Sequence, residues 1–126
     1  MTVRFVLYVL PVLIFFTDRL PQGVGGRSYW LFALIRPKYR EDEGLIQHEL
    51  EHSRQAWKLP LLHQLMYRFS KEYALACEAQ AYRVQTKYPA GPGLPPISVA
   101  NAAQRLRSGI YEFSLTQEEA EALVLG

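Results

Sequence analysis

The residues best suited to chemistry in this sequence are His48-Glu49-Leu50-Glu51-His52. On an α-helix, residues four positions apart lie on the same face, so the imidazoles of His48 and His52 can point at one metal ion. Neutral imidazole nitrogens suit Zn²⁺, and Glu49 between them can polarise a bound water molecule. The alternative is two ordinary histidines on an amphipathic helix. Two of the three histidines in the chain fall at this spacing, which favours the metal site.

A catalytic zinc needs a third protein ligand besides these two histidines and keeps one position open. The metzincin pattern is excluded, because the position of its third histidine is occupied by Lys58. His63 follows Pro60 and could reach the metal only if the chain turned sharply there. The remaining candidates are glutamates further along the chain, Glu72 and Glu78.

We expect Glu78 to be the third ligand. It lies in an apolar helical stretch, residues 73–82, where a lone carboxylate is costly unless it is paired or binds a metal. Glu72 is near the expected helix start, where the helix dipole explains an acidic residue. Six helical residues span about 600°, so both carboxylates cannot point at the same metal. The alternative for Glu78 is a solvent-facing side chain or one paired with Lys71 or Arg83.

The HELEH motif, followed by Glu78 in the sequence CEAQAY, resembles the gluzincin class of zinc metallopeptidases. The resemblance is closest to very small bacterial and phage versions and covers about half the chain. It implies that His48, His52 and Glu78 bind Zn²⁺ and that Glu49 acts as general base and later as acid. The implied reaction is hydrolysis of a peptide or amide bond by a zinc-activated water, and the implied partner is a peptide or protein substrate.

Tyr82 departs from the pattern of the larger gluzincins. They carry an aspartate four residues after the glutamate ligand, and it accepts a hydrogen bond from the first histidine. Here Tyr82 holds that position, on the same helix face as Glu78. Its hydroxyl could accept the same proton or act catalytically as an electrophile toward the oxyanion. Its ring could also simply belong to the core.

The elements that must position these residues begin with β structure. The strands expected from runs of Val, Ile, Leu and Phe are Val3–Leu10, Val12–Thr17 and Ser28–Arg36. Pro11 lacks a backbone donor and must lie at an edge, at a bulge or between two short strands. A glycine-rich connection is expected over residues 18–28. The last strand could lie at the sheet edge and pair with an extended substrate.

Helices follow the strands. We expect a first helix from about Gly44 to Leu59, capped by Asp42, and either one helix or two between Leu61 and Tyr88, with Ser70 as a possible cap. Beyond the Pro/Gly-rich residues 89–96 we expect a helix at Ser98–Ser108, a strand at Ile110–Ser114 and a last helix opened by the capping box Thr116–Glu119.

This order predicts an α+β fold in a single domain, residues 1–126. Residues 1–41 are mainly strands, residues 42–88 are helices with the metal site, and residues 89–126 are a Pro/Gly linker and a C-terminal extension. A small sheet packs on the HELEH helix, and a second helix delivers Glu78.

The composition limits the classes of partner and the cellular location that we expect. The chain has 14 Lys+Arg scattered among 12 Asp+Glu, without the basic stripe typical of a nucleic-acid-binding protein. The apolar run Phe5–Phe16 is too short to span a membrane. A signal peptide is the alternative, but no small-x-small cleavage site follows that run. A single cysteine, Cys77, excludes an intramolecular disulfide. We therefore expect no nucleic acid, no membrane span and a cytoplasmic location.

Two other functions remain open on this sequence. The chain could be an inactive binding or regulatory protein that keeps the zincin scaffold, or a zinc hydrolase of a non-protein amide. Metal content separates a metal site from ordinary histidines, and Glu49→Gln separates an enzyme from an inactive scaffold.

Overall fold

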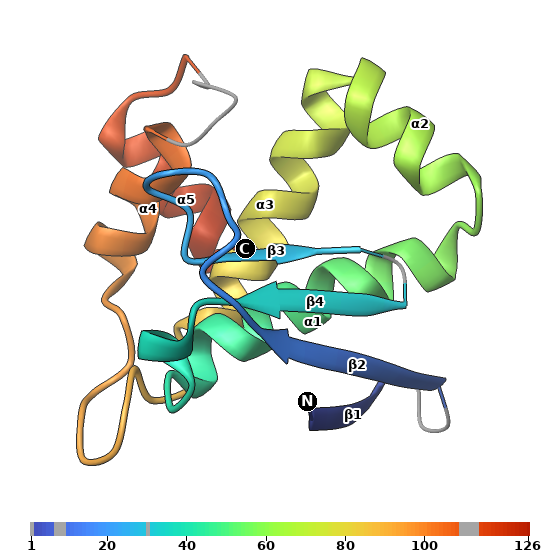
Figure 1. Ribbon diagram of the computed structural model, residues 1–126. Helices are drawn as coiled ribbons and strands as arrows, with labels where there is room; N and C mark the ends of the chain where they lie inside the picture. Colours follow the sequence, from blue (N-terminus) through green and yellow to red (C-terminus); the bar gives the residue numbers. More distant parts are fainter. Residues whose placement is uncertain (1, 7–9, 30, 109–113) are drawn as a thin grey trace.

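The computed structural model describes residues 2–6, 10–29, 31–108 and 114–126 (Figure 1). It contains a mixed sheet made of β1 (Thr2–Val6), β2 (Leu10–Phe16), β3 (Gly26–Ser28) and β4 (Phe32–Ile35), in the order β1-β2-β4-β3. β2 and β4 are parallel, and the two outer pairs are antiparallel. The expected α+β class is confirmed.

Five α-helices accompany the sheet in the described residues. They are α1 (Glu43–Lys58), α2 (Leu62–Phe69), α3 (Lys71–Gln85), α4 (Val99–Arg107) and α5 (Gln117–Leu125). Asp42 caps α1 by accepting a hydrogen bond from Leu45 N, and Thr116 forms the expected capping box with Glu119. The chain after Leu61 forms two helices, and Ser70 caps the second of them. None of these helices is long and apolar enough to cross a lipid bilayer.

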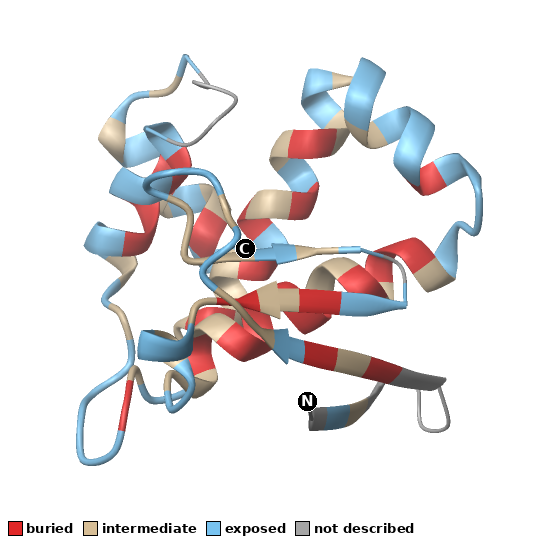
Figure 2. Ribbon diagram, viewed as in Figure 1, coloured by how far each residue is buried: buried red, intermediate tan, exposed pale blue. Residues whose placement is uncertain are grey.

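The sheet packs on α1 through one face. Alternating residues of β2 and β4 are almost completely buried, as the burial colours of Figure 2 show. The cluster comprises Val12 and Ile14 of β2, Ile35 of β4, and Ile46 and Leu50 of α1. This core fixes the helix that carries both histidines against the sheet.

A second core joins α3 to the two C-terminal helices. Its fully buried residues are mainly small: Ala74, Ala79, Ala102, Ala103, Leu106, Ala120 and Val124. Arg83 of α3 adds hydrogen bonds to the carbonyl oxygens of Leu123 (2.8 Å) and Val124 (3.1 Å). Residues 99–107 and 117–125 therefore brace the helix that carries Glu78.

The prediction of one strand over Ser28–Arg36 is wrong. β3 ends at Ser28, the chain turns, and Tyr29 N donates to Phe32 O (2.7 Å) before β4 runs back. β3 begins inside the stretch expected to be a flexible connection and is an edge strand, whereas β4 is interior. The apolar run continues across the turn, so hydrophobicity alone could not reveal it.

Pro11 lies inside β2, opposite Phe5 of β1. The parallel pairing with β4 begins only at Leu13, so Pro11 occupies a part of β2 with a strand on one side. This position tolerates the missing backbone donor. The strand expected at Ile110–Ser114 falls largely outside the described residues.

Candidate metal centre

The HELEH helix and the Glu78 helix come together at the start of α1. A Cβ atom on Gly44 would lie 3.1 Å from Tyr88 O and 3.2 Å from Gln85 Cγ, so the close approach of the two segments favours glycine. His48 follows one helical turn later and faces the same neighbour. The spacing between α1 and α3 is thereby set where the candidate ligands lie.

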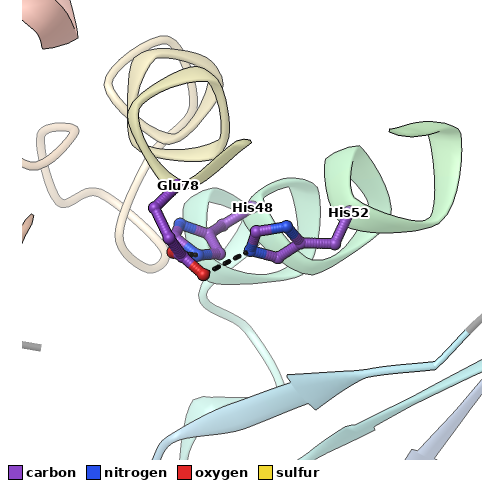
Figure 3. Close-up of side chains that lie close together, drawn as sticks. All are labelled: His48, His52 and Glu78. Carbon is purple, nitrogen blue, oxygen red and sulfur yellow. Dashed lines mark ion pairs between the residues drawn. The ribbon is translucent and has the colours of Figure 1, made fainter. Parts of the chain in front are cut away.

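The structure brings the three expected ligands together (Figure 3). The Nε2 atom of His52 is 3.2 Å from Oε1 of Glu78, and the Nε2 atom of His48 is 3.5 Å from Oε2 of Glu78. One ligand atom from each residue lies within 4.8 Å of the others. Glu72, in the first turn of α3, is exposed and does not belong to this group. The role of the three as metal ligands stays a prediction.

His52 and Glu78 form a tight ion pair. Burial alone would lower the pKa of His52, but the Glu78 carboxylate raises it to about 9. Burial would likewise raise the pKa of Glu78, yet His52 and His48 hold it well below its usual range. Without a metal ion, the charged forms of His52 and Glu78 therefore stabilise each other.

Glu49 lies beside this group and is almost completely buried. The residue is 5% exposed, and its Oε1 is 3.9 Å from His48 Nε2. A Cβ atom on Gly26 of β3 would lie 3.2 Å from Glu49 Cγ, so the edge strand leaves just enough room for the carboxylate. Burial raises the pKa of Glu49, while the neighbouring His48 and His52 oppose the rise.

Gln55 orients His52, a contact that the sequence analysis missed. The Nε2 of Gln55 donates to Cys77 O (3.0 Å) and to Gln80 Oε1 (3.1 Å). Its Oε1 is therefore the atom that faces His52 Nδ1, at 3.0 Å, and the imidazole must donate to it. This leaves Nε2 of the neutral ring free for a metal. The spacing of three residues on one helix was a signal that could have identified Gln55.

Tyr67 is the second missed residue. Its hydroxyl donates to Oε1 of Glu78, and its ring lies edge-on to His52 with the centroids 6.0 Å apart. The residue comes from α2, whose docking on α3 is a tertiary contact. No spacing in the sequence pointed to it.

Tyr82 does not make the contact expected of a proton acceptor. The Nδ1 atom of His48 is buried and has no hydrogen-bond partner among the described residues. The ring of Tyr82 lies edge-on to His48, with the centroids 4.5 Å apart, and packs against the second core. Burial and the Glu78 charge raise the pKa of its hydroxyl. The structure places Tyr82 as a packing partner of His48, and its catalytic role stays a prediction.

His63 does not join the candidate ligands. It is buried on α2, and its Nδ1 lies 2.8 Å from the hydroxyl of Tyr73. Cys77 is also buried, and burial raises the pKa of its thiol to about 11, so the sulfur stays protonated and unreactive near neutral pH.

The donor set and its spacing fit a zinc ion. Two histidines and one glutamate form the protein ligands of a known kind of catalytic zinc site. Two ligand atoms about 2.1 Å from a tetrahedral zinc lie roughly 3.4 Å from each other. The separations of 3.2 Å and 3.5 Å from the Glu78 carboxylate oxygens to the two histidine Nε2 atoms are close to this value.

No known protein family, curated protein or solved structure matches this chain, so its function has to be inferred from the residues of this site.

Proposed function

We propose that this protein is a zinc-dependent metallopeptidase in which His48, His52 and Glu78 hold the metal. The observation that carries the proposal is the pair of separations from the Glu78 carboxylate to the two histidines, 3.2 Å and 3.5 Å. Such spacing between ligand atoms on two separate helices is compatible with one shared tetrahedral ion. The open fourth position would serve water or substrate.

Zinc, when bound, supplies Lewis-acid activation of a water molecule and of the substrate carbonyl. Glu49 would serve as the general base toward the attacking water and as the acid toward the leaving amine. Its burial supports this role, because a raised pKa makes the carboxylate a better proton acceptor. Gln55 holds the His52 ring so that Nε2 faces the metal position.

A peptide substrate is supported by the position of β3. This strand forms one edge of the sheet within the described residues, and its Gly26 lies against Glu49. An extended peptide can add to such an edge through main-chain hydrogen bonds. A peptide aligned in this way would pass close to Glu49.

The alternatives are an inactive zincin scaffold and a zinc hydrolase acting on a non-protein amide. The test has two steps. Metal analysis of purified protein should give about one zinc per chain. Incubation with a peptide library of mixed sequence, read by mass spectrometry, should then give defined cleavage products.

Glu49→Gln should keep the zinc and abolish the cleavage. Glu51→Gln is the matched control, because Glu51 lies in the same motif but pairs with Arg54 at 3.1 Å instead of facing the metal position. Absence of zinc would contradict the proposal. Zinc without cleavage of any peptide would favour one of the two alternatives.

A further inference from the structure

The apolar residues of α2 form a stripe that faces solvent. Leu62, Leu65, Met66 and Phe69 follow the i, i+3, i+4, i+7 spacing of one helix face and are 56%, 57%, 39% and 76% exposed. In a globular protein such a face normally packs on the core. Figure 2 shows most of α2 in the colour of exposed residues, and Figure 1 shows the loop of residues 89–96 far from α2, at the other side of the molecule.

The opposite side of α2 is the one that docks on the protein. His63 contacts Tyr73, and Tyr67 contacts Glu78, both on α3. These polar and aromatic contacts fix the rotation of the helix. The α2 stripe is therefore held outward by the rest of the fold, and rotating it inward would break the contacts of Tyr67 at the metal centre.

Leu61, just before α2, adds to the exposed apolar surface. Its side chain is 75% exposed, and its φ of 71° is a left-handed value that costs a branched apolar residue free energy. Neither burial nor backbone preference explains a leucine at this position. Contact of its side chain with another molecule or surface would explain it.

The exposed charges around the α2 stripe are mostly positive. Lys58, Arg68 and Lys71 are exposed, no aspartate or glutamate occurs between Lys58 and Lys71, and the one acidic neighbour, Glu72, lies beyond them in the first turn of α3. A second copy seated on this stripe by two-fold symmetry would bring the same cations together. A surface that carries negative charge and accepts leucine, methionine and phenylalanine side chains fits it better. An anionic lipid bilayer has both properties.

We propose that the α2 stripe docks on the surface of an anionic lipid bilayer, with its apolar side chains in the acyl boundary and the flanking cations at the headgroups. Docking of this kind needs no spanning helix. It would also place the metal centre next to the membrane, because Tyr67 reaches that centre from the same helix.

Vesicle co-sedimentation of the full chain tests the proposal. We expect binding to vesicles of phosphatidylcholine mixed with phosphatidylglycerol, little binding to phosphatidylcholine alone, and weakening at high salt. Leu65→Ser should weaken binding about tenfold, and Arg68→Gln about fivefold. Leu94→Ser is the matched control, since its side chain is 56% exposed but lies outside the α2 stripe.

Circular dichroism should show that all three variants keep the wild-type fold, because each changes an exposed side chain. No binding of the wild type to the mixed vesicles would overturn the proposal. Equal losses in Leu65→Ser and Leu94→Ser would also overturn it. A dimer that Leu65→Ser dissociates, without vesicle binding, would instead assign the α2 stripe to contact between copies of the chain.

Discussion

The imidazole of His52 and the carboxylate of Glu78 lie 3.2 Å apart, although the two residues come from different helices. With the pKa of His52 at about 9 and that of Glu78 well below its usual range, the metal-free pair is an imidazolium and a carboxylate at neutral pH. A proton therefore sits on the nitrogen that a zinc ion would occupy. This competition between proton and metal governs the first two predictions.

Zinc affinity should depend on pH over an unusually high range. Binding must remove the proton from His52, so the apparent affinity should rise about tenfold per pH unit until it levels off near pH 9. Calorimetric titration in buffers of different ionisation enthalpy measures the protons released. Binding that releases no proton at neutral pH would contradict this account of the site.

The stability of the metal-free protein should fall on the alkaline side. The pKa of His52 is raised above its unfolded value of 6.5, so its contribution is complete below that pH and disappears as the pH rises through about 9. The pKa of Glu78 is lowered, so its contribution is present above 4.5 and is lost as the pH falls further. Urea unfolding across this pH range measures the free energy of unfolding and so both the alkaline and the acidic decrease. Glu78→Gln should flatten the alkaline decrease, and an unchanged decrease would contradict the pairing.

The two glutamates of α3 should differ sharply in zinc binding. Glu78→Gln should weaken it by orders of magnitude, because a ligand is lost. Glu72→Gln should leave it nearly intact, because Glu72 is exposed on the first turn of α3. Competition with a chelator gives both affinities. The reverse ranking would refute the assignment of Glu78, but it would leave His48 and His52 as candidates.

Gln55 should act through the orientation of His52. Gln55→Leu removes the acceptor for His52 Nδ1 and should weaken zinc binding about tenfold to a hundredfold. Gln80→Leu removes one partner of Gln55 Nε2 but leaves its bond to Cys77 O and the acceptor for His52 in place, so it should change the affinity little. A purely structural role predicts a different result, in which both variants lose stability and zinc affinity stays that of the wild type.

Gly44 should be intolerant of any side chain. A Cβ atom there would meet backbone and side-chain atoms of Gln85 at 3.2 Å, so Gly44→Ala should destabilise the protein by about 1–3 kcal/mol. Gly91→Ala is the control, because its Cβ would meet the flexible end of the Leu94 side chain. Thermal unfolding compares the two variants. Equal changes in thermal stability would show that the residues around Gly44 can shift to accommodate a side chain.

The helix starts were predictable because capping is a local interaction. Asp42, Ser70 and Thr116 each accept a hydrogen bond from a backbone N–H three residues later, and their positions followed from residue type alone. The shared helix face of His48 and His52 was predictable for the same reason, because it depends only on their spacing along one helix. The turn at Tyr29, by contrast, lies within a continuous apolar run and produced one predicted strand where there are two.

The surroundings of the site were less predictable because they depend on contacts between helices. Glu78 could be chosen from the cost of a lone carboxylate in an apolar stretch. The contact of Tyr67 with Glu78 depends on how α2 folds back on α3, which no periodicity encodes. Helix spacing left three roles open for Tyr82, and only the packing of the folded chain shows that its ring lies against His48.

The bracing of α3 by α5 has a consequence for the order in which the chain matures. Arg83 is held by the carbonyl oxygens of Leu123 and Val124, and Val124 belongs to the core that fixes α3. On the ribosome, both histidines emerge long before these residues do. Glu78 therefore gains the support of α5 only once residues 117–125 have been made and have folded back on α3.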